Sequence, residues 1–180
     1  YDDEIPKIVL NLQNSYLYLQ GPPGSGKTYQ SANAIIELLK NNKKIAVTAN
    51  SHKVIHNLLE RVENLAKNQK YVFKGLKMGN PDNEDTFYDG NLIKTDKNEK
   101  HYIDGLKDNK ILLYAGTKYH LSQWYYQNKL DYLFVDEASQ ISVADLIALG
   151  GIAKNIVLVG DQQQLGQPTQ GSHPNDSGKS

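Results

Sequence analysis

The fold is decided by residues 16–28, which read YLYLQGPPGSGKT. The first four of these residues form a short apolar and aromatic run that is typical of a buried strand. A glycine-rich turn follows, and residues 27–40 then carry apolar side chains at mostly helical spacing until Asn41 and Asn42 end the run. The stretch therefore predicts a strand, a tight turn and a helix in direct succession.

The turn fits the pattern G-x-x-x-x-G-K-S/T, which is typical of phosphate-binding loops. Its glycines let successive backbone N–H groups point at phosphate oxygens, and the positive end of the following helix faces the same anion. We expect Lys27 to reach the β- and γ-phosphates of a nucleotide and the Thr28 hydroxyl to ligate Mg²⁺. The predicted phosphate-binding residues are Gly21, Pro23, Gly24, Ser25, Gly26, Lys27 and Thr28.

Four further apolar runs predict strands in the rest of the chain. They show no alternation of apolar and polar residues, which marks strands covered on both faces, as in a parallel sheet with helices on each side. We expect a helix capped by Asn50 or Ser51, and helices near residues 118–128 and 143–153. With residues 16–19 the five strands form a doubly wound α/β sheet, and the other four runs are residues 45–47, 111–114, 132–135 and 156–159.

Residues 68–109 break this alternation of strands and helices. They are rich in Asn, Asp, Lys and Gly, with only weak strand signals at residues 71–73 and 92–93. We expect an insertion here, either partly mobile or folded as a small subdomain, within one domain that covers residues 1–180.

The composition restricts the classes of protein to be considered. The 180 residues include 20 Lys+Arg, 20 Asp+Glu and no cysteine. No stretch approaches the roughly 20 apolar residues needed to cross a bilayer, and the acidic start is unlike a signal peptide. Without cysteine there is no disulfide framework, so the cytoplasm is the expected compartment. The first residue, Tyr1, and the polar run at 174–180 indicate a domain cut from a longer protein.

The charges are unevenly distributed along the chain. Residues 38–81 carry eight Lys and Arg61 against Glu60 and Glu63, whereas residues 82–108 carry eight acids against four Lys. The two segments are either solvated stretches of opposite sign or, for the basic one, part of a face that binds a polyanion. Charge alone leaves both interpretations open.

Polar residues follow the last two predicted strands, at the sheet edge where the phosphates are expected. Asp136 can hold Mg²⁺, and Glu137 can orient and deprotonate the water that attacks the γ-phosphate. A kinase would need a bound acceptor in place of this water. Gln164 follows the strand at 156–159, and its neutral amide can sense the γ-phosphate without competing for the metal.

At these residues the chain resembles superfamily 1 helicases. GPPGSGKT, DEASQ and GDQQQLGQP look like motifs I, II and III of that family, in the same order and on the same strand ends. The branch most similar contains the nonsense-mediated-decay RNA helicase and bacterial helicases fused to RecB-like nucleases. Further similarity to the bacterial subgroup lies in Gln20 and in residues 48–53, 115–117 and 170–174. The resemblance covers about residues 15–174 and implies a RecA-like P-loop NTPase domain that uses ATP and Mg²⁺.

The resemblance also implies a nucleic-acid partner. In the family, the segment after the second strand touches the sugar-phosphate backbone of a single strand, which assigns this role to Asn50 and Ser51, with Thr117 contributing from the next strand end. Hydroxyl and amide groups at a helix N-terminus bind phosphate without reading sequence. DNA is favoured over RNA because the bacterial look-alikes are joined to nucleases.

Family members hydrolyse ATP between two RecA-like domains, and the second domain supplies arginines that stabilise the transferring phosphoryl group. This chain has one arginine, Arg61, which is expected on a helix distant from the P-loop. The fragment is therefore expected to bind nucleotide and turn it over very slowly. A P-loop phosphotransferase and a nucleotide-gated nucleic-acid-binding module are the alternatives, and Gln13 is a weak candidate for contacting adenine.

Overall fold

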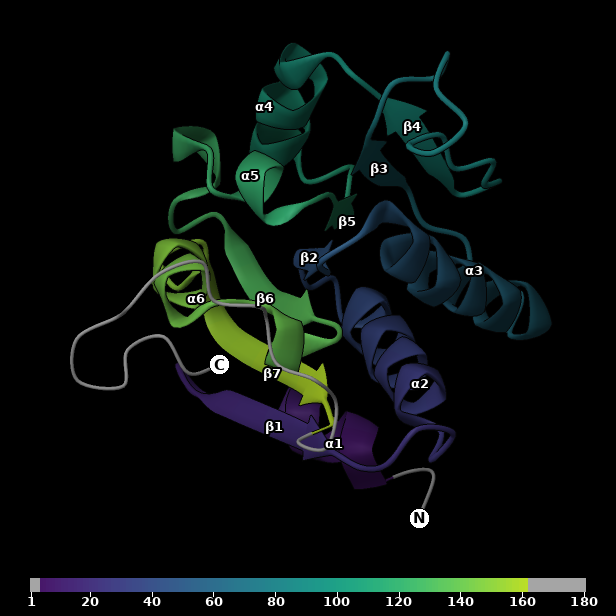
Figure 1. Cartoon of the computed structure of the whole chain (residues 1–180). Coiled ribbons are helices and arrows are strands. Elements are labelled where there is room, and N and C mark those ends of the chain that lie inside the picture. Colours follow the sequence, from purple (N-terminus) through teal and green to yellow (C-terminus); the bar gives the residue numbers. More distant parts are fainter. Residues whose placement is uncertain (1–3, 162–180) are drawn as a thin grey trace.

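The computed structural model describes residues 4–161, which form one parallel sheet of seven strands with helices on both faces (Figure 1). Every pair of neighbouring strands is parallel, in the order β1-β7-β6-β2-β5-β3-β4. The strands are β1 Tyr16–Gln20, β2 Ile45–Thr48, β3 Gly75–Met78, β4 Ile93–Asp96, β5 Leu113–Ala115, β6 Leu130–Val135 and β7 Ala153–Gly160. The α/β fold with a parallel sheet is confirmed, and all five predicted strands are present.

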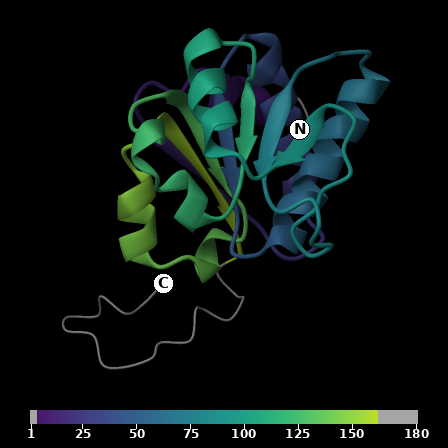
Figure 2. The same cartoon turned by 90° about the horizontal axis from the view of Figure 1, so that it is seen from above.

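The helices lie in two layers, and each layer covers its own apolar core (Figures 1 and 2). One layer consists of α1 Glu4–Leu10, α2 Lys27–Lys40 and α3 His52–Asn68, and the other of α4 Glu99–Asp108, α5 Lys118–Leu121 and α6 Val143–Leu149. Two 3₁₀ turns complete the set, Trp124–Tyr126 and Ala138–Gln140. Within residues 4–161 no helix is both long and apolar enough to pass through a bilayer.

The central strands are buried on both faces, as their continuous apolar runs predict. In β2, Ile45 and Val47 belong to the core under α1, α2 and α3, whereas Ala46 faces the opposite core. In β6, Phe134 belongs to the core under α1, α2 and α3, and Leu133 belongs to the opposite core. This burial fixes the register of the strands, because a slip by one residue would exchange the two faces.

Several helix predictions are corrected by the structure. The helix expected at 118–128 is the short α5 followed by the 3₁₀ turn Trp124–Tyr126, and α6 ends at Leu149 because β7 begins at Ala153. Helices α1 and α4 were not predicted. Helix α1 is held by the burial of Val9 and by a 2.9 Å hydrogen bond that the Tyr132 hydroxyl donates to the carbonyl oxygen of Val9.

The segment 68–109 continues the main sheet. Strands β3 and β4 extend its edge beyond β5, and α4 packs Tyr102 and Leu106 into the second core. The weak strand signal at 92–93 falls at the start of β4, whereas residues 71–73 precede β3 and are not a strand.

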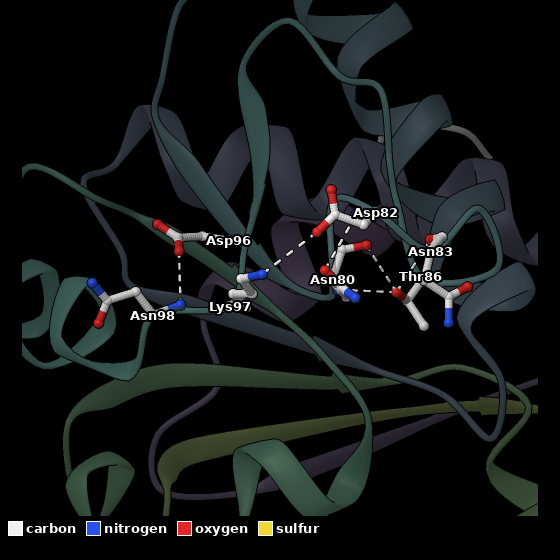
Figure 3. Close-up of polar contacts among 7 residues, drawn as sticks. All are labelled: Asn80, Asp82, Asn83, Thr86, Asp96, Lys97 and Asn98. Carbon is white, nitrogen blue, oxygen red and sulfur yellow. Dashed lines mark hydrogen bonds and ion pairs between the residues drawn. The ribbon is translucent and has the colours of Figure 1, made fainter.

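The loops of this segment are ordered by local polar contacts (Figure 3). Between β3 and β4, the Asn80 N–H donates to the Thr86 hydroxyl at 3.0 Å. After β4, the Asn98 N–H donates to Asp96 at 2.8 Å, and Lys97 lies 3.6 Å from Asp82 of the preceding loop. Turns closed by Asn and Asp side chains in this way explain why a stretch rich in these residues still holds a defined path.

Helix α3 anchors the edge strand β4 through one side chain. The Glu63 carboxylate accepts hydrogen bonds from the backbone N–H groups of Asn91, Leu92 and Ile93, at 3.0, 2.8 and 2.8 Å. The same carboxylate would lie 2.6 Å from a Cβ placed on Gly90, so the loop approaches α3 more closely than a residue with a side chain allows. Charge-assisted bonds to three successive amides hold the strand against the helix.

We expect Glu63→Ala to lower the free energy of unfolding by about 2–4 kcal/mol, because three amides lose their acceptor. Glu63→Gln keeps the shape and one acceptor oxygen, so it should lower the free energy of unfolding by less than Glu63→Ala. Urea denaturation of both variants measures the difference. An alanine variant as stable as the original chain would show that Glu63 does not anchor β4.

Candidate nucleotide site

The phosphate-binding loop joins the end of β1 to the start of α2. Gly24 and Gly26 adopt φ values of 78° and 83°, a left-handed conformation that side chains disfavour. Gly26 caps α2, and the loop closes with a 3.2 Å hydrogen bond from the Ser25 N–H to the Pro22 carbonyl. The first N–H groups of α2 have no carbonyl partner within the helix, so this end is suited to an anion.

Lys27 bends back over the loop that carries it. Its ammonium group donates to the Pro22 carbonyl at 2.8 Å and also to the Gly21 carbonyl. Both acceptors are neutral oxygens. A phosphate oxygen is a stronger acceptor because it is charged, so an incoming phosphate can take over these bonds without a change in the loop.

Asp136 and Glu137 follow β6 at the same edge of the sheet. Glu137 has a left-handed backbone, with φ 50° and ψ 45°, and its N–H donates to Asp136 at 2.9 Å. A non-glycine residue in this conformation is strained, and such strain is concentrated at functional sites. The turn separates the two adjacent carboxylates, and Glu137 is more exposed than the buried Asp136.

Burial is the main cause that raises the pKa of Asp136 to about 6. The charge of Glu137 acts in the same direction, whereas the Glu137 N–H and Lys27 lower the pKa. A desolvated carboxylate is destabilised until a cation compensates it. Asp136 and the Thr28 hydroxyl line the same cavity and offer hard oxygen donors, so these two residues fit the Mg²⁺ ion that the sequence predicts.

One cavity of about 370 Å³ brings the loop and the acids together. The phosphate-binding loop and the residues at the ends of β6 and β7 line this cavity. Its residues include Pro23, Gly24, Ser25, Gly26, Lys27, Thr28, Asp136, Glu137, Gly160 and Asp161. The predicted Gly21 contributes its carbonyl to Lys27 without lining the cavity, and the predicted Gln164 lies outside the described residues.

The cavity also contains residues that sequence reasoning missed. Asp161, at the end of β7, adds a third carboxylate. Tyr29 follows the loop, and Val54, Asn57 and Arg61 come from α3. Arg61 was expected far from the P-loop, and this expectation is wrong because α3 packs beside α2. The sequence shows that Val54, Asn57 and Arg61 are spaced to lie on one side of a helix. It does not show which other element that side of the helix would face.

The predicted adenine candidate Gln13 lies elsewhere. It lines a separate cavity with Lys43, Asp131 and Lys154, residues that precede or begin β2, β6 and β7. These positions mark the amino edge of the sheet, whereas the phosphate-binding loop lies at the carboxyl edge. Gln13 is therefore excluded as a contact of the adenine ring.

The predicted nucleic-acid residues come from two neighbouring strand ends. Val47 of β2 pairs with Ala115 of β5, so Asn50, Ser51 and Thr117 emerge at the same edge. The Ser51 hydroxyl accepts from the Val54 N–H at 3.3 Å and so caps α3, and Asn50 lies 3.4 Å from Gln140. Thr117 caps α5 without a side-chain hydrogen bond to the helix.

The basic segment 38–81 does not form one face. Lys40 pairs with Glu37 at 2.7 Å, and Lys44 donates to the Leu106 carbonyl at 2.6 Å. Lys40 is the last residue of α2 and Lys44 directly precedes β2, so both lie at the amino edge. Of the lysines near Asn50 in the chain, Lys53 is exposed in the first turn of α3, at the carboxyl edge.

A phosphate-binding loop, a helix that starts on it and acids at the adjacent strand ends define a P-loop nucleotide-binding domain. The chain belongs to the AAA domain family, whose model matches residues 4–177. Nucleotide binding is therefore a property of the class to which it belongs.

Comparison with known proteins shows that the chain is similar to helicases. The chain is 27% identical over 165 residues to the DNA replication ATP-dependent helicase/nuclease dna2 of Schizosaccharomyces pombe, covering 92% of the chain and 12% of that protein. It is 28% identical over 164 residues to the RecBCD enzyme subunit RecD of Buchnera aphidicola subsp. Schizaphis graminum, covering 88% and 24%. The chain thus spans a small part of these relatives. The resemblance to the RecA-like domain of superfamily 1 helicases is confirmed.

A solved structure shows the same fold. The Arterivirus nonstructural protein 10 helicase, in complex with DNA, superposes with a TM-score of 0.55 at 16% identity, over 96% of this chain and 34% of that one. At this identity the likeness supports the fold alone.

The raised pKa of Asp136 predicts a stability change that depends on pH. Because the folded protein holds this proton more tightly than the unfolded chain, ionisation opposes folding. The penalty is absent below about pH 4, grows between about pH 4 and 6 and is complete above. We expect Asp136→Asn to raise the free energy of unfolding by up to about 3 kcal/mol at pH 7 and to change it little at pH 4.

Urea denaturation of Asp136→Asn at the two pH values measures this effect. Glu137→Gln removes the neighbouring charge that raises the pKa of Asp136, so it should raise stability at pH 7 by less than Asp136→Asn and change it little at pH 4. A gain of equal size at pH 4 and pH 7 would show that the buried charge is not its cause.

Proposed function

We propose that this chain is the ATP-binding motor domain of a superfamily 1 helicase, which couples ATP hydrolysis to translocation on single-stranded nucleic acid. The observation that carries the proposal is the cavity shared by Lys27 of the P-loop and the acids Asp136 and Glu137. A helicase needs such a site to bind the triphosphate and to activate water, and the helicase relatives support this reading over a phosphotransferase.

In this proposal each residue has a separate task. Lys27 neutralises the β- and γ-phosphates, and Glu137, which lines the same cavity, accepts the proton of the attacking water. Gln164 senses the terminal phosphate. Thr28 and Asp136 would hold Mg²⁺, which when bound neutralises charge on the phosphates. The remaining loop residues bind phosphate oxygens through backbone N–H groups.

We expect Lys27→Ala to weaken the binding of a fluorescent ATP analogue at least about tenfold, since a charge-assisted contact to phosphate is lost. Lys40→Ala, at the exposed other end of α2, is the matched control and should bind as the original chain does. Titration by fluorescence anisotropy with Mg²⁺ measures both. Equal affinity of the Lys27 variant and the original chain would refute the nucleotide site.

Asn50, Ser51 and Thr117 are proposed to contact the sugar-phosphate backbone of the single strand, with Lys53 beside them. The relatives named as a DNA replication helicase/nuclease and as a subunit of the RecBCD enzyme support DNA as the partner. They also support a second RecA-like domain and a nuclease domain in the parent protein. Arginines from that second domain are proposed to complete the catalytic site, so residues 1–180 alone would be nearly inactive.

The two edges of the sheet give a direct test of the nucleic-acid face. Lys53→Ala should weaken binding of a labelled oligo-dT strand and lower the slope of log affinity against log salt by about one unit. Lys43→Ala removes the same charge at the amino edge and should leave both unchanged. Anisotropy titrations over a range of salt concentrations measure the slope. If Lys43→Ala had a larger effect than Lys53→Ala, the nucleic acid would bind at the amino edge of the sheet, and the proposed face would be wrong.

A further inference from the structure

Arg61, the one arginine of the chain, lies beside the phosphate-binding loop. Val54, Asn57 and Arg61 are spaced by three and four residues, so they form one stripe along α3, and all three line the loop cavity. Side chains of a helix lean toward its N-terminus, which for α3 is the carboxyl edge of the sheet. A long side chain from the third turn of α3 is thereby directed toward the loop.

The guanidinium is not committed to another group within residues 4–161. Arg61 is exposed and takes part in none of the ion pairs found in this part of the chain. Its neighbours on the helix surface, Glu60 and Asn64, line a second cavity with Tyr29, and Arg61 lies at the boundary of the two. The five N–H donors of Arg61 are therefore available at the mouth of an anion-binding cavity.

The charges of the cavity favour a cation at this position. Among residues 4–161, the cavity is lined by the carboxylates of Asp136, Glu137 and Asp161, and Lys27 is the other cationic side chain there. A nucleotide triphosphate adds further negative charge close to these acids. A second cation beside Lys27 attracts the phosphates, and a guanidinium suits phosphate oxygens because it can donate two parallel hydrogen bonds.

We propose that Arg61 binds the polyphosphate chain of the nucleotide held by the P-loop. This deepens the proposed function and rests on it. Arg61 acts from the same RecA-like domain as Lys27, before any second domain closes on the site. It contributes affinity for the phosphates, and Tyr29, like Arg61, lines both cavities.

The experiment uses isothermal titration calorimetry of the 180-residue chain with ATP, ADP and inorganic tripolyphosphate in the presence of Mg²⁺. We expect Arg61→Gln to weaken the affinity for all three ligands about tenfold. Arg61→Lys keeps the charge without the paired donors and should recover part of the loss. Lys67→Gln is the matched control, because Lys67 is exposed on the last turn of α3 and lines neither cavity. Thermal unfolding checks that the variants remain folded.

Two results would overturn the inference. Unchanged affinity of Arg61→Gln for tripolyphosphate, with ATP weakened, would assign the contact to the base or ribose. Unchanged affinity for all ligands would remove the contact altogether. If the original chain binds nucleotide in a manner that depends on Lys27, either result refutes the role of Arg61 alone, whereas absence of binding by the original chain refutes the proposed function itself.

Discussion

The parallel pairing of β1, β7, β6 and β2 is the constraint on which the candidate site depends. Parallel strands all end at the same edge of a sheet, so the loops that follow them meet there. The order of these four strands sets the P-loop beside Asp161 and the pair Asp136–Glu137, with α3 next to them. A different strand order would leave the same motifs intact and separate them in space.

The same constraint sets the nucleic-acid candidates beside the nucleotide cavity. Strand β6 lies between β7 and β2, and β5 lies on the far side of β2, so Asn50 and Thr117 continue the line of strand ends. Asn50 lies 3.4 Å from Gln140, which belongs to the turn that follows Glu137. This contact connects the turn after Glu137 to the segment proposed to hold the strand.

The edge of the sheet beyond β5 shows why part of the fold could not be predicted. Strand β3 contains Lys77, whose side chain is fully buried and donates to the Thr86 carbonyl. Glu63 holds the amides of Asn91 and Leu92, which precede β4, and of Ile93, its first residue. Both strands make polar contacts with residues outside the strand itself, and the apolar patterns used to find strands do not detect such contacts. Helix α4 was missed for a related reason, because its buried face is short and carries a tyrosine.

The sequence by itself determined the phosphate-binding loop, the five apolar strands and the order of the acids after them. These features depend on local rules: glycines at 24 and 26 permit a left-handed turn, and uninterrupted apolar runs require burial on both faces. Only the tertiary structure decided that Arg61 faces the loop, that Gln13 does not, and that Lys40 and Lys44 lie on the edge opposite Asn50. Each of those outcomes follows from which strands and helices become neighbours, and that choice is made by long-range packing of the whole sheet.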